Sequence, residues 1–250
     1  MAAPDSFHLA EQLDASDYTR QRMDPRPDDQ FYLHLLDLRQ ALDACGTSKA
    51  VQLLDFGCGG SPYKGLFPNA TYHRADYVPM PDLQFQVTPE GTLPAVAASA
   101  YDVILSTQVL EHVPNPQTYL AEALRILKPG GTLVLSTHGT FPDHGCPFDF
   151  WRWTADGLAA ELTRAGFSAP SIRRLTSGPR AVVFLFDQLC FSRSSGLFMK
   201  VLSALYRRMR SLTNRIAAFC LDSHAQNSDP SPGSLDICIA LLATATKPKP

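Results

Sequence analysis

Residues 51–61 read VQLLDFGCGGS, and this stretch decides the fold. An apolar run, Val51–Leu54, is followed by the acid Asp55 and then by three glycines within four positions. Because glycine has no Cβ, the chain can turn sharply after a strand and a ligand can approach the backbone amides. The stretch therefore predicts the first strand and the ligand-binding turn of a doubly wound α/β domain.

The glycine spacing argues against a dinucleotide as the ligand. A dinucleotide-binding turn follows the pattern G-x-G-x-x-G, and counting from Gly57 the third glycine position is occupied by Pro62. Asp55 lies just before the turn, where its charge would repel a pyrophosphate. A zwitterionic ligand that carries a sulfonium group would tolerate this acid or use it.

Three further blocks follow in order along the chain. Tyr72–Asp76 reads as a second strand that ends in an acid, 21 residues after Asp55, close to the interval expected for a ribose-binding carboxylate. Residues 101–113 and 127–135 read as a fourth-strand block and as a turn into a fifth strand. Together with the glycine turn, these blocks resemble the class I S-adenosylmethionine-dependent methyltransferase superfamily, in its type 11-like form.

The resemblance implies an α/β, Rossmann-like, doubly wound fold with a mostly parallel seven-stranded sheet. Its last strand would be antiparallel, with a helical insertion before it. The alternation of strand and helix patterns over 51–137 favours a parallel sheet on its own. We expect residues 1–27 to form a loose N-terminal segment and 28–250 a methyltransferase domain, with the insertion at about 179–221.

The remaining elements are placed by periodicity and by their end signals. Apolar spacing predicts helices over Asp28–Ala44 and Thr154–Ala165. Ser171–Thr176 and Leu235–Thr244 are the expected sixth and seventh strands. Some sixty residues separate these two strands, which is long for a hairpin connection, so the intervening segment is predicted to be helical.

Composition limits the class of protein. The chain has 250 residues, 45% apolar and 18% charged, with a formal net charge of −2, which fits a globular protein and disfavours one that coats nucleic acid. Six scattered cysteines predict reduced thiols and a cytoplasmic location, and the N-terminal residues do not read as a secretory signal. No run of 18 uninterrupted apolar residues occurs, so we expect no spanning helix.

The resemblance implies S-adenosyl-L-methionine as the cofactor. Its methionine part would lie against the glycine backbone, Asp55 would organise its ammonium group, and Asp76 would accept hydrogen bonds from its ribose. Residues that follow the fourth strand should line the same cleft, because ligands lie beyond the carboxyl ends of parallel strands. The expected cofactor-binding residues are Asp55, Gly57, Cys58, Gly59, Gly60, Asp76, Tyr77, Ser106, Thr107 and Gln108.

Residues 136–154, STHGTFPDHGCPFDFWRWT, concentrate polar and aromatic side chains after the fifth strand. A histidine with a pKa near neutrality suits the removal of a proton from a hydroxyl acceptor. His144 and His138 are the candidate bases, with His144 preferred; Asp149 would orient such a histidine, and Arg152 would bind an acidic group of the acceptor. The alternative is a self-packed loop that an Asp149–Arg152 pair ties to the following helix.

For two other groups of polar residues we expect neither catalysis nor metal binding. Glu111-His112 follows the fourth strand, and we favour a capping and packing role for this pair over a catalytic one. His138, His144, Cys146 and Asp149 could converge on a cation, but their spacing matches no zinc signature, so we expect no metal.

The insertion at 179–221 is basic and amphipathic, with seven Lys or Arg residues against one acid, Asp187. We favour a purely structural role, in which the insertion is a helical cap that buries its apolar face on the domain and exposes its arginines to solvent. The alternative is a surface for peripheral contact with a membrane or an anionic partner.

The predicted activity is methyl transfer from S-adenosylmethionine to a small-molecule or glycan-like acceptor, at oxygen. The acceptor atom is inferred only from the histidine-bearing loop. One alternative is a lipid or quinone-like acceptor at a membrane surface, and another is a non-catalytic, cofactor-binding interaction domain. A nucleic-acid acceptor is disfavoured by the near-neutral charge, and the number of subunits stays open.

Overall fold

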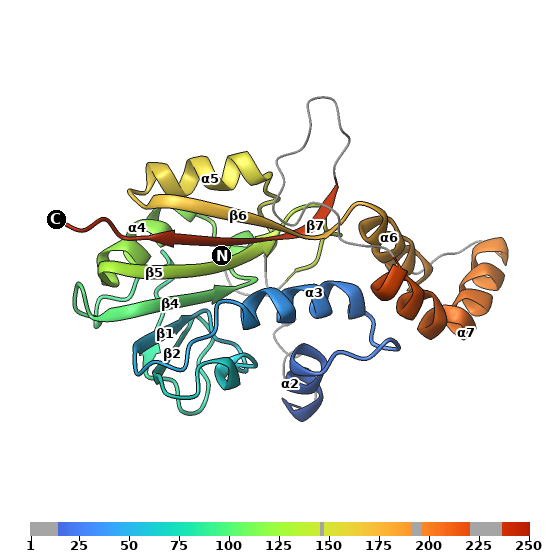
Figure 1. The fold of residues 1–250 in the computed structure, drawn as a ribbon, viewed down its shortest axis with the longest axis horizontal. Coiled ribbons are helices and arrows are strands. Elements are labelled where there is room, and N and C mark those ends of the chain that lie inside the picture. Colours follow the sequence, from blue (N-terminus) through green and yellow to red (C-terminus); the bar gives the residue numbers. More distant parts are fainter. Residues whose placement is uncertain (1–14, 146–147, 192–196, 221–236) are drawn as a thin grey trace.

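The computed structural model describes residues 15–145, 148–191, 197–220 and 237–250. These residues form a seven-stranded sheet with the order β3-β2-β1-β4-β5-β7-β6 (Figure 1). The strands are β1 Gln52–Phe56, β2 Thr71–Asp76, β3 Phe85–Gln86, β4 Tyr101–Thr107, β5 Leu127–His138, β6 Ser168–Ser177 and β7 Cys238–Thr246. The predicted fold class is confirmed.

The direction of the strands sets where a ligand can bind. β1 pairs in parallel with β2 and β4, and β4 pairs in parallel with β5. β7 runs antiparallel to both of its neighbours, β5 and β6. The parallel strands therefore end at one edge of the sheet, and the loops at this edge hold the residues singled out in the sequence.

Helices cover both faces of the sheet. The α-helices are α2 Ala15–Met23, α3 Tyr32–Asp43, α4 Pro116–Ile126, α5 Ala155–Arg164, α6 Pro179–Phe191 and α7 Leu197–Cys220, with two 3-10 turns, η2 Lys64–Leu66 and η3 Leu110–His112. α4 and α5 pack on one face through residues such as Tyr119 and Leu158, and α3 packs on the other through Leu38 and Leu42. Figure 1 shows α5 and α3 on opposite sides of the sheet.

The helix starts follow from local sequence. The Asn115 side chain accepts a hydrogen bond from the Thr118 amide, and Pro116 occupies the first turn of α4. The Thr154 hydroxyl oxygen accepts a bond from the Gly157 amide at the start of α5. Each cap satisfies a backbone donor that a helix end leaves free, which explains why these helices begin where they do.

The N-terminal segment differs from the expectation of a loose lead-in. Residues 1–14 lie outside the described part of the chain, but α2 occupies Ala15–Met23. The guanidinium of Arg20 donates to both carboxylate oxygens of Asp29 at 2.9 and 2.6 Å, which ties α2 to the segment before α3. The Arg20–Asp29 pair forms only in the folded chain, so the polar sequence of residues 1–27 gave no sign of an ordered helix.

The insertion is helical as predicted and consists of α6 and α7, which lie beyond the carboxyl ends of the parallel strands (Figure 1). The favoured interpretation of its packing holds for α6, which buries Ala181 and Phe184 against Ile239 of the sheet. It is wrong for α7, where Leu205 is 58% exposed and Leu212 is 57% exposed. Within the described ranges, no helix combines the length and the apolar character that crossing a membrane would need.

Candidate active site

The glycine turn connects β1 to the segment before β2. Gly57 has a φ of +85°, and a Cβ at this position would lie 2.4 Å from Cγ2 of Val109. The amides of Gly57 and Cys58 both donate to the Ala75 carbonyl, at 2.8 and 3.0 Å. Only glycine fits this close approach and this backbone conformation, so the turn is held against the ends of both neighbouring strands.

Asp76 ends β2 beside this turn. Its Oδ2 accepts a hydrogen bond from the Gly59 amide at 2.8 Å, and its Oδ1 accepts one from the Val78 amide at 2.9 Å. An ionised carboxylate offers about four acceptor positions, so the two oxygens can also accept bonds from the hydroxyl groups of a ligand. The adjacent Tyr77 side chain is exposed at the same edge.

Asp55 lies beneath the turn rather than on its surface. Its carboxylate is buried and accepts a hydrogen bond from the Tyr72 hydroxyl at 2.6 Å. Burial raises the pKa of Asp55 to about 7, although hydrogen bonds from Tyr72 and Ser61 oppose the rise. The Asp55 carboxylate is therefore not exposed at the surface of the turn, where the expected contact with an ammonium group would need it.

The three residues after β4 have different surroundings. Ser106 is fully buried, and its hydroxyl lies 2.8 Å from the Tyr119 hydroxyl, which donates to the Phe56 carbonyl. Thr107 and Gln108 are half-buried. Gln108 donates from Nε2 to Ser136 Oγ at 3.0 Å. Ser106 supports the first strand from the core, whereas its two successors lie closer to the surface.

Gln108 has two unusual features for a residue at this edge. Its φ is +56°, a conformation that non-glycine residues rarely adopt, and such strain gathers at functional sites. Its Oε1 is buried and accepts no hydrogen bond from the described residues. A buried acceptor without a partner is costly, so Gln108 is a candidate for contact with a bound molecule.

Tyr18 on α2 is a contact that the sequence did not suggest. A Cβ added to Gly60 would lie 3.2 Å from the Tyr18 ring, and one on Gly59 would lie 3.4 Å from the Tyr18 hydroxyl. The Arg22 guanidinium carbon lies 3.5 Å from the centroid of the same ring. α2 thus covers the glycine turn, and Tyr18 forms part of the wall around it.

His138 ends β5 in a buried cluster. Its ring stacks on Phe141 with centroids 3.9 Å apart, and its Nδ1 lies 3.2 Å from Glu111 Oε1. The other carboxylate oxygen, Oε2, accepts a bond from the Thr137 hydroxyl at 2.8 Å. Burial lowers the pKa of His138 and raises that of Glu111 to about 7, so burial favours the uncharged form of both groups.

His144 lies closer to solvent and has an oriented ring. Its Nδ1 lies 3.3 Å from Asp149 Oδ2 and 3.3 Å from the Pro142 carbonyl oxygen. The ring centroid is 4.9 Å from that of His138 and 5.0 Å from that of His112. Two acceptors beside Nδ1 favour the tautomer with the proton on this nitrogen, which leaves Nε2 able to accept a proton.

His112, in contrast, is held by the backbone. Its Nδ1 lies 2.6 Å from the Phe148 carbonyl oxygen, and burial lowers its pKa. The backbone carbonyl of the preceding Glu111 accepts bonds from the Phe150 and Trp151 amides. These contacts support the packing role that we favoured for the Glu111-His112 pair, while Glu111 also reaches His138.

Arg152 is occupied within the loop. Its two Nη atoms donate to the two oxygens of Asp149 at 2.6 Å each, and the other donors reach the carbonyls of Phe141, Pro142 and Trp151. All five guanidinium donors are thereby used. This arrangement supports the self-packed interpretation for Arg152 rather than the binding of an acidic acceptor.

The same contacts define the charge of Asp149. Burial alone would raise its pKa, but hydrogen bonds from Arg152 and the His144 amide outweigh that effect and lower the pKa to about 2. Asp149 therefore stays ionised at neutral pH beside the His144 ring. Cys146 lies outside the described residues, and among those described no cluster of three or more His, Cys, Asp or Glu side chains could hold a metal ion.

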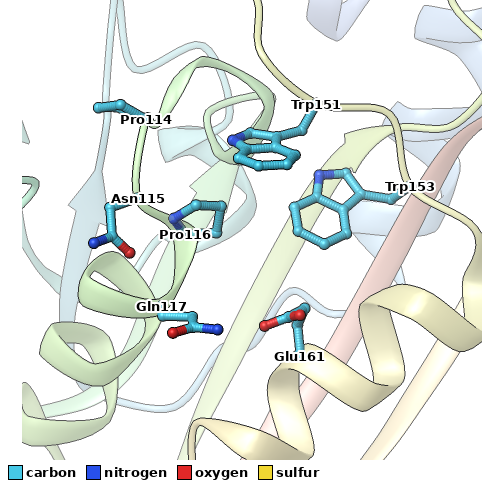
Figure 2. Close-up of a pocket in the computed structure, with 7 residues that line it drawn as sticks. All are labelled: Pro114, Asn115, Pro116, Gln117, Trp151, Trp153 and Glu161. Atoms are coloured by element: carbon cyan, nitrogen blue, oxygen red, sulfur yellow. The ribbon is translucent and has the colours of Figure 1, made fainter.

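A cavity of about 320 Å³ lies near the start of α4 and the side of α5 (Figure 2). It is lined by Pro114, Asn115, Pro116, Gln117, Trp151, Trp153 and Glu161. None of the residues predicted for the cofactor or for catalysis lines it. The two tryptophans belong to segment 136–154, which also carries His138 and His144, so this cavity borders the site without forming it.

The chain is similar to known methyltransferases. A family described as a methyltransferase domain matches residues 28–175. The ubiquinone biosynthesis O-methyltransferase of Cereibacter sphaeroides is 35% identical over 36% of this chain, and the chain spans only 42% of that relative's length. A thiol S-methyltransferase of Rattus norvegicus is 31% identical over 50% of this chain and 60% of its own length.

A solved structure shows the same fold at low identity. Phosphoethanolamine N-methyltransferase 2 of Haemonchus contortus, in complex with S-adenosyl-L-methionine, matches with a TM-score of 0.53 and 12% identity. The match covers 100% of this chain and 60% of the other.

Proposed function

Since the chain belongs to the family of methyltransferase domains, we propose that it is an S-adenosylmethionine-dependent enzyme that methylates an oxygen atom of a small-molecule or glycan-like acceptor. When bound, this cofactor supplies an electrophilic methyl group on a sulfonium ion. The observation that carries the choice of oxygen is the orientation of His144, whose Nδ1 faces Asp149 and whose Nε2 is left to accept a proton.

The residues around the glycine turn fit the cofactor. At Gly57 and Gly60 a side chain would meet Val109 or Tyr18, so glycine lets the turn pack closely against these neighbours. Asp76 would hold the ribose hydroxyls from the end of β2, next to the exposed Tyr77. The buried Oε1 of Gln108, with no partner among the described residues, would accept a bond from the ligand.

His144 would act as the general base. A hydroxyl must lose its proton as the oxygen attacks the methyl group, and His144 Nε2 would take that proton. Asp149, with a pKa near 2, would keep its negative charge and stabilise the imidazolium that forms. His138 would serve as a buried neighbour that holds the ring of His144 in place, since their centroids lie 4.9 Å apart.

A turnover assay tests this proposal. The purified chain is incubated with S-adenosylmethionine and a panel of catechols, sugars, thiols and amines, and the release of S-adenosylhomocysteine is measured. Mass spectrometry of the product then locates the methyl group. Methylation at oxygen supports the proposal, whereas transfer only to sulfur or nitrogen shows that the acceptor atom is wrong.

A second candidate acceptor is lipid-like or quinone-like and would be reached at a membrane surface. The exposed apolar side chains of α7 favour it, because a free small-molecule acceptor would not require them. The relative from Cereibacter sphaeroides, named for ubiquinone biosynthesis, is compatible with this acceptor class. Residues 179–221 would make the peripheral membrane contact.

A non-catalytic role as a cofactor-binding interaction domain is the third candidate. It predicts cofactor binding with no turnover of any acceptor, including detergent-solubilised quinols. Cofactor titration, together with turnover of the acceptor panel and of detergent-solubilised quinols, therefore separates the three proposals.

A further inference from the structure

α7 packs with its polar side inward and its apolar side outward, the reverse of an ordinary helix on a globular domain. The inward positions are buried and spaced by three or four residues: Tyr206, Arg210, Asn214 and Ala217. The outward positions follow the same spacing on the opposite side of the helix: Val201, Leu205, Met209, Leu212, Ile216 and Phe219. We call these six residues the apolar stripe.

The inward face is anchored by specific polar contacts. The Arg210 guanidinium donates to both oxygens of Asp187 on α6, at 2.8 and 2.9 Å, and also to the backbone carbonyls of Asp28 and Asp29. The Asn214 side-chain amide donates to the Pro27 carbonyl at 2.7 Å. These buried bonds fix the rotation of α7, so the apolar stripe cannot turn inward without leaving a buried charge unpaired.

The apolar stripe is large and well exposed. The exposed fraction of its six side chains ranges from 50% for Ile216 to 91% for Phe219. The helix has 24 residues and is therefore about 36 Å long at 1.5 Å per residue. An exposed apolar surface that runs along a helix of this length marks an interaction site.

Charge along one border of the apolar stripe indicates its partner. Arg208 is exposed and lies three residues after Leu205 and four before Leu212. Arg215 is exposed and lies three after Leu212 and four before Phe219. Residues at these spacings are neighbours on a helix surface. The whole of α7 contains five Lys or Arg residues and no Asp or Glu.

This charge pattern disfavours a second copy of the same helix. Two α7 helices packed stripe to stripe would bring arginines together, with no acid on either helix to pair with them. An anionic lipid surface complements the pattern, because its headgroups would meet the arginines while its acyl chains cover the apolar stripe.

We propose that α7 docks in the interface of an anionic phospholipid bilayer, with the apolar stripe inserted and with Arg208 and Arg215 at the headgroups. This proposal specifies the membrane contact suggested under the second candidate function. Its link to a lipid-like acceptor rests on that proposed function. α6 connects this surface to the site: Phe184 on α6 lies 5.5 Å from Phe141, and Phe141 stacks on His138. A docked α7 would thus hold the loop that carries His138 and His144 beside the bilayer.

The test is co-sedimentation of the purified full chain with vesicles. One set is equimolar phosphatidylglycerol and phosphatidylcholine, and the other is phosphatidylcholine alone. We expect binding to the anionic set that weakens with added salt. Leu205→Ser combined with Leu212→Ser should weaken that binding at least roughly tenfold, with an unchanged melting temperature, because both side chains are exposed.

A charge variant separates insertion of the apolar stripe from electrostatic attraction between the arginines and the anionic headgroups. Arg208→Gln with Arg215→Gln should weaken binding to anionic vesicles about thirtyfold, which corresponds to about 1 kcal/mol for each arginine. Lys49→Gln with Arg164→Gln removes the same charge from exposed positions outside the insertion and should change binding little.

Three results would overturn the proposal. They are no binding of the unaltered chain to anionic vesicles, equal binding of the leucine variant, or self-association in sedimentation velocity that the leucine variant abolishes. The last would assign the apolar stripe to an interface between copies. Cofactor titration in vesicle-free buffer is independent of all three, so failure of the proposed enzyme activity is recognised separately.

Discussion

The carboxylate of Asp76 accepts a hydrogen bond from the Gly59 amide, with Oδ2 and the nitrogen 2.8 Å apart. This bond joins the end of β2 to the glycine turn that follows β1. It holds the carboxylate beside the glycine turn, where we place the ribose of the cofactor.

Asp76→Ala should therefore weaken the binding of S-adenosylmethionine about tenfold to a hundredfold, because hydrogen bonds to a charged group contribute about 1.5–3 kcal/mol. Calorimetric titration measures the change. Asp82→Asn alters an exposed acid on the following loop and serves as the control. Unchanged affinity in the Asp76 variant would show that the ribose assignment is wrong.

Gly57→Ala should destabilise the protein by about 1–3 kcal/mol. The substitution places a Cβ 2.4 Å from Val109 at a φ of +85°. Gly65→Ala is the matched control, since its Cβ would lie 3.8 Å from Met23 in ordinary contact. Urea unfolding reports both values, and equal stability of the two variants would contradict the close packing of the turn.

His144→Ala should reduce turnover about a hundredfold or more and leave cofactor affinity intact, because a general base acts only in the chemical step. His73→Gln is the control; this histidine lies on β2 and bonds the Tyr101 hydroxyl. The assay needs an acceptor found in the panel described above. Full activity of the His144 variant would place the base elsewhere, with His138 the next candidate.

The stability of the ligand-free protein should depend on pH through Asp55. Its ordinary pKa is 3.8 and its folded pKa is about 7, so the folded state keeps a proton that the unfolded state releases in between. The resulting stabilisation is complete below pH 3.8 and is lost as the pH rises through 7, with a slope of up to about 1.4 kcal/mol per pH unit.

Asp55→Asn should remove this contribution and flatten the pH dependence of the free energy of unfolding. Glu111, whose pKa is also raised to about 7 by burial, acts in the same direction and keeps part of the slope. Urea unfolding of both proteins across this pH range makes the comparison. An unchanged slope in the variant would mean that Asp55 is ionised in the fold.

The fold class and the starts of two helices could be predicted because short local patterns indicate them. The strand, acid and glycines of residues 51–61 fix the first turn, and Asn115 and Thr154 fix two helix starts. The helical nature of the insertion also followed from its spacing. These features depend on residues that are close together in the sequence.

The rest depends on contacts between distant residues. Ser106 ends up in the core because strand alternation turns it toward Tyr119. Tyr18 reaches the glycine turn because Arg20 binds Asp29. The spacing of α7 shows two faces, but tertiary contacts such as the Arg210–Asp187 pair and the Asn214–Pro27 bond decide that the polar face turns inward.

The most direct test of the cofactor is calorimetric titration of the purified chain with S-adenosylmethionine and S-adenosylhomocysteine, with NADH as the control. We expect micromolar binding of both adenosyl ligands and none of NADH, because the turn lacks the third glycine and has Asp55 beneath it. Absence of binding by both adenosyl ligands, or comparable binding of NADH, would contradict it.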